Sequence, residues 1–342
     1  MSVASTLAET DWLRRSASLT GGARGHKEWW HFCAYGPEVD VLVNFSLVDD
    51  VREGSAPGAE YARVTLLVRD RGWDGAVDLY AADEVDAPGG GLSMRFGENV
   101  AEFRDGAYRL RARAKRRPIE VDLTITPTAL PSLANNITLD PGPPINWLVV
   151  PRGEATGTVT VAGRAHALDR APAYHDHNWG RFAWGRDFAW EWGFGLPQRD
   201  EPWSVVFVRL SDRAHTLARM QALFLWRGAR QHRVMRGSEL TVARRGLLRP
   251  ERVLKVPRVM GLVSPSTATD VPARLEVEAE ADGDRVECVF TASDLAQVVI
   301  PNDHDAGVTI INEVSGAVRV EGEVRGERVR MEGRAIFEFL GA

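Results

Sequence analysis

Two short segments of the sequence hold most of the side chains that could do chemistry. One is 27–32, with the sequence KEWWHF, and the other is 174–180, with the sequence YHDHNWG. Both place carboxyl and imidazole groups between aromatic side chains. Apolar surroundings shift the pKa of such groups and can fit them for proton transfer. The two segments are therefore the first candidates for a functional site.

Strand alternation divides the second segment into two faces. In an extended strand, successive side chains point to opposite sides. Tyr174, Asp176 and Asn178 then share one face. The other face carries His175, His177 and Trp179.

Asp176 is the candidate for a catalytic acid. Burial in an aromatic wall raises the pKa of a carboxyl group, often by several units. A carboxyl that stays protonated near neutral pH can donate its proton to a substrate, with Tyr174 as its hydrogen-bonding partner or relay. A nearby cation, for which His31 and Arg152 are the candidates, would instead keep Asp176 as a fixed anion. In a purely structural alternative, Asp176 binds backbone N–H groups of a loop.

The histidine pair suggests a metal site only weakly. His175 and His177 share a face, and His31 or Glu28 could supply the third ligand that a metal needs. The chain has no familiar metal-ligand spacing, so two polar or structural histidines are favoured and no metal is predicted.

Tryptophan is unusually frequent, with 11 residues in the chain. An indole ring suits a pocket wall, since it has an apolar face and one N–H donor. It also suits an ordinary core, and both interpretations stay open. Six tryptophans fall in one central stretch: Trp147, Trp179, Trp184, Trp190, Trp192 and Trp203.

Other familiar chemistries lack their motifs. The sequence has no GxSxG nucleophile elbow, no GxGxxG after a predicted strand, and no GxxxxGK[ST] phosphate loop. Serine hydrolysis, dinucleotide binding and P-loop phosphate binding are therefore not supported.

The elements that must position these residues are predicted to be strands. Apolar and polar residues alternate with a period of two, which is typical of antiparallel strands with one buried face. Turn signals such as Asp105-Gly106 and Asp282-Gly283 separate them. Two stretches, 211–222 and 291–299, are predicted as short helices. The clearest alternating segments are 41–47, 64–68, 108–114, 119–125 and 275–279.

An internal similarity predicts two related domains. The sequence GTVTVAG at 157–163 matches GAVRVEG at 316–322. A return strand follows each, with Asp176 in the first and Glu338 in the second. A chance match between two hairpins is the alternative. Duplication predicts an N-terminal β domain at 1–185 and a C-terminal β domain at 186–342.

Length and composition agree with a two-domain globular protein. The chain has 342 residues, with 44 % hydrophobic and 26 % charged residues. Its net charge of −5 argues against nucleic acid as a partner. No apolar run reaches the ~20 residues of a membrane span. Two cysteines and the absence of an apolar leader lead us to expect a cytoplasmic protein without disulfides.

The motifs, taken together, resemble a known family. The EWWHF segment, Trp147 followed by Pro151-Arg152-Gly153, and YHDHNWG followed by WEWG at 190–193 are similar to the lipocalin-like family of carotenoid 1,2-hydratases and AttH-type proteins. The resemblance implies two calycin-like antiparallel β-barrels in tandem. Its best-known members add water to a terminal double bond of an acyclic carotenoid without a redox cofactor. Fungal relatives assist Diels–Alder cyclisations.

The resemblance also suggests site residues. Tyr174 and Asp176 match the tyrosine and aspartate proposed to be needed in the hydratases. Those enzymes use an upstream His-x-Trp pair, of which this chain matches Trp147 but has Ile145 in place of the histidine. That departure argues against hydration of a carotenoid itself.

We therefore expect a cofactor-independent enzyme that acts on a hydrophobic unsaturated small molecule, an isoprenoid or polyene. The reaction would be acid-assisted hydration or cyclisation of a C=C bond. A cyclase that works by shape alone and a non-catalytic lipophile-binding protein are the alternatives. Asp176 and Tyr174 are the expected catalytic residues. The expected substrate-binding residues are Glu28, Trp30, His31, Trp147, Asn178, Trp179 and Trp192.

Overall fold

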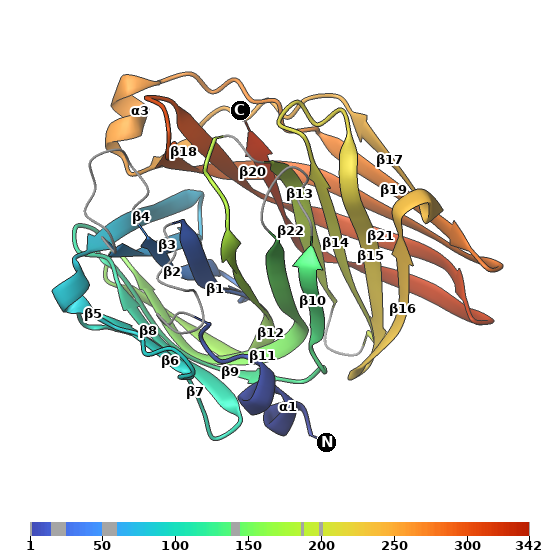
Figure 1. The fold of residues 1–342 in the computed structure, drawn as a ribbon, viewed down its shortest axis with the longest axis horizontal. Coiled ribbons are helices and arrows are strands. Elements are labelled where there is room, and N and C mark those ends of the chain that lie inside the picture. Colours follow the sequence, from blue (N-terminus) through green and yellow to red (C-terminus); the bar gives the residue numbers. More distant parts are fainter. Residues whose placement is uncertain are drawn as a thin grey trace. The chain divides into compact units, whose positions relative to one another are not determined.

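The chain is almost entirely β-structure. A computed structural model describes residues 2–14, 25–49, 60–137, 144–185, 188–197 and 201–341 (Figure 1). Strands make up 67 % of the structure and helices 6 %. The predicted all-β fold with two antiparallel, lipocalin-like sheets is confirmed.

Two compact units divide the chain. Unit 1 comprises Met1–Trp184 together with Asn302–Ala306, and unit 2 comprises Gly185–Pro301 together with Gly307–Ala342. The predicted division into two duplicated β domains at residue 185 stays a prediction.

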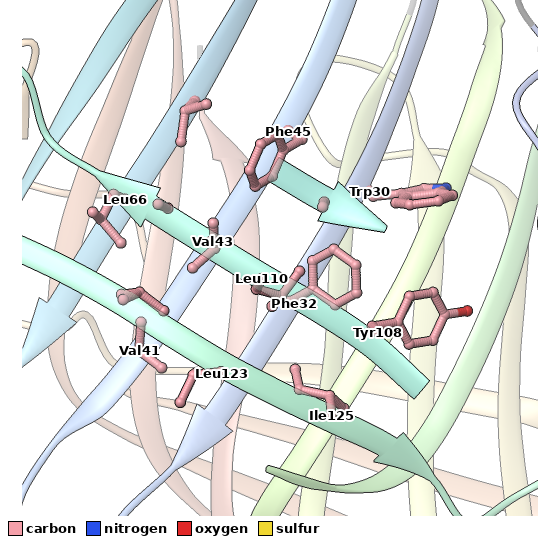
Figure 2. Packing of buried hydrophobic residues seen from close by; sticks show 14 of the residues in the cluster. Trp30, Phe32, Val41, Val43, Phe45, Leu66, Tyr108, Leu110, Leu123 and Ile125 are labelled. Carbon is pink, nitrogen blue, oxygen red and sulfur yellow. The ribbon is translucent and has the colours of Figure 1, made fainter. Parts of the chain in front are cut away.

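Unit 1 is one curled antiparallel sheet in the order β4-β3-β2-β1-β12-β11-β9-β8-β7-β6-β5, with β10 paired to β11. The curl brings the inner faces of the first strands against those of β8 and β9, as Figure 2 shows. A short helix α1 (Val3–Thr10) precedes the sheet, and η1 (Ala82–Glu84) is a single 3₁₀ turn. The strands are β1 (His26–Tyr35), β2 (Asp40–Asp49), β3 (Glu60–Arg69), β4 (Trp73–Tyr80), β5 (Val85–Asp86), β6 (Ser93–Phe96), β7 (Asn99–Arg104), β8 (Ala107–Arg113), β9 (Ile119–Pro127), β10 (Ser132–Ile137), β11 (Ile145–Val161) and β12 (Arg164–Arg181).

Unit 2 repeats this plan in the order β16-β15-β14-β13-β22-β21-β20-β19-β17. In both units the first strand pairs with the last one, so a long closing hairpin completes each sheet. The short β18 pairs with β20 in parallel, unlike its neighbours. The elements are β13 (Ala189–Pro197), β14 (Trp203–Ser211), β15 (Ala218–Arg227), β16 (Arg230–Arg236), η2 (Gly237–Glu239), β17 (Leu240–Arg245), β18 (Leu254–Val256), α3 (Val259–Val263), β19 (Arg274–Ala281), β20 (Asp284–Pro301), β21 (Val308–Val324) and β22 (Glu327–Gly341).

The two glycines that begin the matched hairpin sequences share a physical role. A Cβ on Gly157 would lie 2.1 Å from the Asp122 carbonyl oxygen, and one on Gly316 would lie 2.2 Å from that of Thr291. Each glycine lets the neighbouring strand approach more closely than any side chain would allow.

Both helix predictions were wrong. The stretch 211–222 contains the turn between β14 and β15, and 291–299 lies within β20. A register shift between Ala292 and Asp294 interrupts the strand alternation within this part of β20. Among the described residues, no helix is long and apolar enough to span a membrane.

Candidate functional site

Strand β12 carries the candidate site. It lies between β1 and β11, and a different set of side chains projects from each of its two faces. Its inner face points into the hydrophobic core of unit 1, and its outer face points away from that core. On the outer face, Asp176 lies directly opposite His31 of β1 and Val149 of β11. Cross-strand neighbours of this kind are close enough for their side chains to interact.

The outer network consists of Tyr174, Asp176 and Asn178. The Tyr174 hydroxyl donates to Asp176 Oδ2 at 2.9 Å, and Asn178 Nδ2 donates to Asp176 Oδ1 at 2.8 Å. Tyr174 is 1 % exposed and Asp176 is 3 % exposed. The prediction that these three side chains share one face is confirmed. Each Asp176 oxygen accepts a hydrogen bond from a neutral donor.

His31 adds an imidazole to the outer face. Asn44 Nδ2 donates to its Nδ1 at 3.5 Å, which leaves Nε2 to donate to the Cys33 sulfur at 3.1 Å. Burial, with a further contribution from the charge of His175, lowers the pKa of His31 to about 3. His31 is therefore neutral near pH 7 and is not the cation that would fix Asp176 as an anion.

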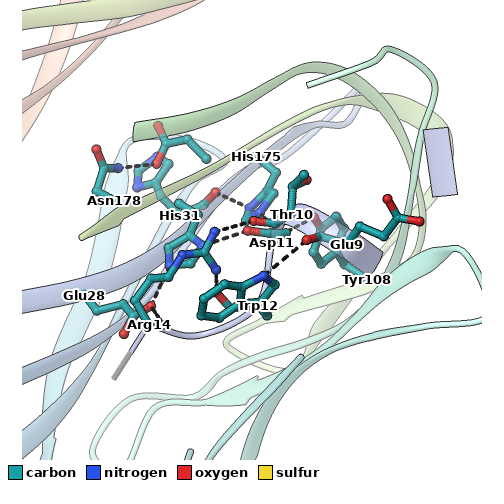
Figure 3. Close-up of polar contacts among 12 residues, drawn as sticks. Glu9, Thr10, Asp11, Trp12, Arg14, Glu28, His31, Tyr108, His175 and Asn178 are labelled. Atoms are coloured by element: carbon teal, nitrogen blue, oxygen red, sulfur yellow. Dashed lines mark hydrogen bonds and ion pairs between the residues drawn. The ribbon is translucent and has the colours of Figure 1, made fainter. Parts of the chain in front are cut away.

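The inner network lies on the opposite face and is centred on Asp11, which follows helix α1. His175 Nε2 lies 2.9 Å from Asp11 Oδ2 (Figure 3). His177 Nδ1 lies 2.7 Å from the other oxygen, Asp11 Oδ1. The Tyr108 hydroxyl also donates to Asp11 Oδ2. On its other side, His177 Nε2 lies 2.8 Å from Glu28 Oε1.

Charge pairing fixes the ionisation of the inner network. Burial acts to raise the pKa of Asp11, but the charges and hydrogen bonds of His175 and His177 outweigh it and lower that pKa far below its usual range. Burial likewise acts to raise the pKa of Glu28, but hydrogen bonds from His177 and His26 outweigh it and lower that pKa to about 2. Burial acts to lower the pKa of His177, yet its hydrogen bonds to Asp11 and Glu28 raise it above its ordinary value.

The residues expected to bind substrate are distributed over both faces. His31, Trp147 and Asn178 lie on the outer face with Asp176, since Trp147 is the cross-strand neighbour of Asn178. Their role in substrate binding stays a prediction. The inner face and unit 2 hold the others: Trp30, whose ring lies 6.0 Å from both His175 and His177, Trp179, which lies 4.7 Å from His177, Glu28 beside His177, and Trp192 in β13.

Sequence reasoning missed Asp11 and Tyr108. Tyr108 was recognised only as the first residue of an alternating segment. Asp11 ends a short helix in a segment without periodicity, so only the folded structure brings it to the histidines.

Two cavities lie at the β7–β9 side of unit 1, with volumes of about 550 and 630 Å³. Both are bordered by the exposed side chains of Arg113 and Glu120. Neither is lined by a residue of β12, and their charged borders do not suit a polyene. The apolar cavity expected beside Asp176 stays a prediction.

No metal centre is found within the described residues, where no three His, Cys, Asp or Glu side chains form a group that could hold a metal ion. The two close histidines are instead engaged by carboxylates.

The two antiparallel sheets define an all-β protein built of two lipocalin-like units. No protein-family model and no curated protein matches the sequence. Solved structures match it over nearly its whole length. An AttH-like protein from Nitrosomonas europaea is 15 % identical, with a TM-score of 0.65 and 92 % of each chain covered.

Two further structures share this fold. Kievitone hydratase from Nectria haematococca is 13 % identical, with a TM-score of 0.58, and the match covers 92 % of this chain and 89 % of the hydratase. CghA, solved with Sch210972, is 15 % identical, with a TM-score of 0.57 and coverage of 93 % and 88 %. The resemblance that the sequence motifs suggested is thereby confirmed at the level of the fold.

Proposed function

We propose that the protein is an enzyme that adds a proton to a C=C bond of a hydrophobic small molecule and so starts hydration or cyclisation. The observation that carries the proposal is the contact between the Tyr174 hydroxyl and the Asp176 carboxyl in a buried wall. A buried carboxyl with a hydroxyl relay is suited to proton transfer in surroundings that hold little water.

The proposed reaction begins with protonated Asp176. Its proton moves to one alkene carbon, directly or through the Tyr174 hydroxyl, and the other carbon becomes a carbocation. Water then attacks the cation and returns one proton to the Asp176 carboxylate, so the net change is addition of H₂O. Attack by an internal alkene, followed by loss of a proton, gives a ring instead. No cofactor takes part in either route.

Aromatic and neutral groups on the same face suit this chemistry. The face of Trp147, beside Asn178, could stabilise a cation by about 0.5–2 kcal/mol. His31 is neutral and so does not repel a cationic intermediate. The shared fold with kievitone hydratase, whose name states a hydration, supports the same class of reaction.

Solvent isotopes test the proposal. An acyclic polyene with terminal isopropylidene groups would be incubated with the protein in D₂O and in H₂¹⁸O, and the products analysed by mass spectrometry. Hydration incorporates both deuterium and ¹⁸O, whereas acid-started cyclisation incorporates deuterium only. A product without either label identifies a cyclisation driven by shape and overturns the acid mechanism.

Asp176→Asn is the matching variant, because asparagine keeps the shape but holds no transferable proton. We expect this variant to lose turnover and to keep binding of the polyene. Asp169→Asn, at an exposed position of the same strand, is the control. Binding without turnover in both the wild type and the variant would favour a lipophile-binding protein.

A further inference from the structure

Three hydrogen-bond donors on the inner face of unit 1 converge on one carboxylate. His175 Nε2 and the Tyr108 hydroxyl reach one oxygen of Asp11, and His177 Nδ1 reaches the other. All four side chains are at most 1 % exposed. Burial and the charge of Asp11 raise the pKa of Tyr108, which keeps its hydroxyl a donor.

The ring nitrogens of both histidines face acceptors only. His175 Nδ1 lies 3.1 Å from the His31 carbonyl oxygen, while its Nε2 faces Asp11. His177 lies between the carboxylates of Asp11 and Glu28. Both contacts of each ring are hydrogen bonds only if both nitrogens carry protons. The two rings together face two carboxylates and one backbone carbonyl oxygen.

Further polar groups lie around the two histidines and the two carboxylates of the inner network. His26 Nε2 lies 3.4 Å from Glu28 Oε2, and the backbone N–H of Arg14 donates to Glu28 Oε1 at 2.6 Å. The Arg14 guanidinium lies over the ring of Trp179, 4.5 Å from its centre. His26 lies on the Glu28 side of the network, whereas the Arg14 guanidinium interacts electrostatically with both Glu28 and Asp11.

The Asp11 carboxylate belongs to a short N-terminal segment whose ordered structure requires packing against unit 1. Residues 2–14, here termed the N-terminal plug, contain the eight-residue helix α1 and Asp11. Helices this short are marginal in water without tertiary contacts. The plug is held in the core of unit 1 by Leu7 and Leu13, which have no exposed surface, and by Asp11.

We propose that His175, His177 and Tyr108 form a binding site for a small monocarboxylate inside unit 1, and that Asp11 of the N-terminal plug occupies this site in the structure. The site lies on the face of β12 opposite the outer network and does not depend on the function proposed above. Removing the Asp11 carboxylate leaves three buried donors and an uncompensated positive charge. Such a site attracts an anion of the same shape.

Chemical complementation tests the proposal. Asp11→Gly removes the side chain from Cβ outward, and acetate replaces it almost atom for atom. Asp11→Ala keeps Cβ, so formate is its matching anion. We expect each variant to melt below the wild type and to gain roughly 2–4 °C in Tm with its matching anion, in a saturating manner. Chloride at equal ionic strength is the reference.

Asp11→Asn is the size-matched control, because asparagine fills the space without the charge. It should be destabilised and should gain nothing from acetate or formate. A second readout is the ¹⁵N NMR signal of His177. The chemical shift of Nδ1, which faces Asp11, should move away from its wild-type position in Asp11→Gly and return with acetate, a change that filling of space alone does not produce.

The outcomes are decisive even if Asp11→Gly does not fold in chloride. Refolding yield in acetate then replaces Tm, and a higher yield than in chloride supports the site. Acetate without effect on both Tm and yield would overturn the proposal. So would an equal gain in Asp11→Asn, which would show a general effect of the salt.

Discussion

Asp176 and His177 are consecutive residues of β12, yet their side chains belong to separate hydrogen-bond networks on opposite faces of one sheet. Asp176 is bonded to side chains of its own strand. His177 connects two segments that precede β2, through Asp11 and Glu28. We propose the outer network for chemistry on a substrate, whereas the inner network binds the N-terminal plug to the sheet.

Loss of the Tyr174 hydroxyl should slow the proposed reaction while leaving the fold intact. Tyr174→Phe removes the hydrogen bond to Asp176 Oδ2 but keeps the buried ring. We expect kcat to fall roughly 10²-fold, within the range for one acid–base group, with little change in KM. Tyr80→Phe, which removes another buried hydroxyl of unit 1, is the control. Equal losses in both variants would contradict a role in proton transfer.

The inner network should contribute most to the stability of unit 1 between about pH 4.5 and pH 6.5. The pKa values of Asp11 and Glu28 are lowered in the folded state, so both carboxylates stabilise the fold at pH values above their ordinary pKa values of 3.8 and 4.5. This stabilisation is lost as the pH falls through the lowered pKa values. The raised pKa of His177 stabilises the fold below its ordinary 6.5 and is lost as pH rises through the folded value. Denaturant unfolding at a series of pH values measures both limbs.

His177→Gln isolates the alkaline limb of that profile. The variant leaves two buried carboxylates without their shared cation and should lose about 3–5 kcal/mol near neutral pH. Its stability should no longer fall as pH rises above 6.5. His166→Gln, also in β12 but paired with the exposed carboxylate of Glu38, should keep the alkaline limb. An unchanged limb in His177→Gln would show that another group titrates there.

Glu338 should make unit 2 less stable as pH rises. Burial raises the pKa of Glu338 to about 7, although a hydrogen bond shared with Glu313 and another donated by the Trp190 indole act to lower it. The folded state thus holds a proton that the unfolded state releases above about pH 4.5. Stability therefore falls between pH 4.5 and 7 and levels off above. Glu338→Gln should remove this fall and stabilise the protein by roughly 1–3 kcal/mol above pH 7.

The control for that variant is Glu321→Gln, a half-buried position of β21 whose carboxylate is paired with Arg319. It should leave the pH profile of unfolding unchanged. A fall of equal size in Glu338→Gln and in the wild type would mean that Glu338 ionises alike in the folded and unfolded states.

The matched glycines of the two closing hairpins should tolerate no side chain. Alanine at Gly157 or Gly316 would place Cβ against a backbone oxygen of the adjacent strand, and we expect each to cost about 1–3 kcal/mol. Gly261→Ala in α3 is the control, because the new methyl group would have no neighbour within 4 Å outside the adjoining residues and backbone of its own helix. Thermal unfolding compares the three. A wild-type midpoint for Gly316→Ala would refute a shared packing role.

Alternation predicted what one strand can determine. It placed Tyr174, Asp176 and Asn178 on one face, and it implies that Trp30 and His31, as neighbours, point to opposite faces. It could not predict that β1 lies beside β12, because the pairing of His31 with Asp176 spans most of unit 1. The contacts of Asp11 could not be predicted from the sequence for the same reason. Its partners come from β8 and β12, and no local pattern marks the residue that follows α1.

The pairing of Lys27 with Asp303 has a consequence for how the chain is made. The Lys27 ammonium, 1 % exposed, donates to the Phe182 carbonyl oxygen and to the Asp303 carboxylate, 276 positions later in the sequence. At about 5–20 residues per second, a ribosome adds Asp303 on the order of tens of seconds after Lys27. A nascent chain can thus carry every strand of unit 1 and still lack the counter-ion of a cation that the finished fold buries. Translation of unit 1 is complete only when most of unit 2 has already been synthesised.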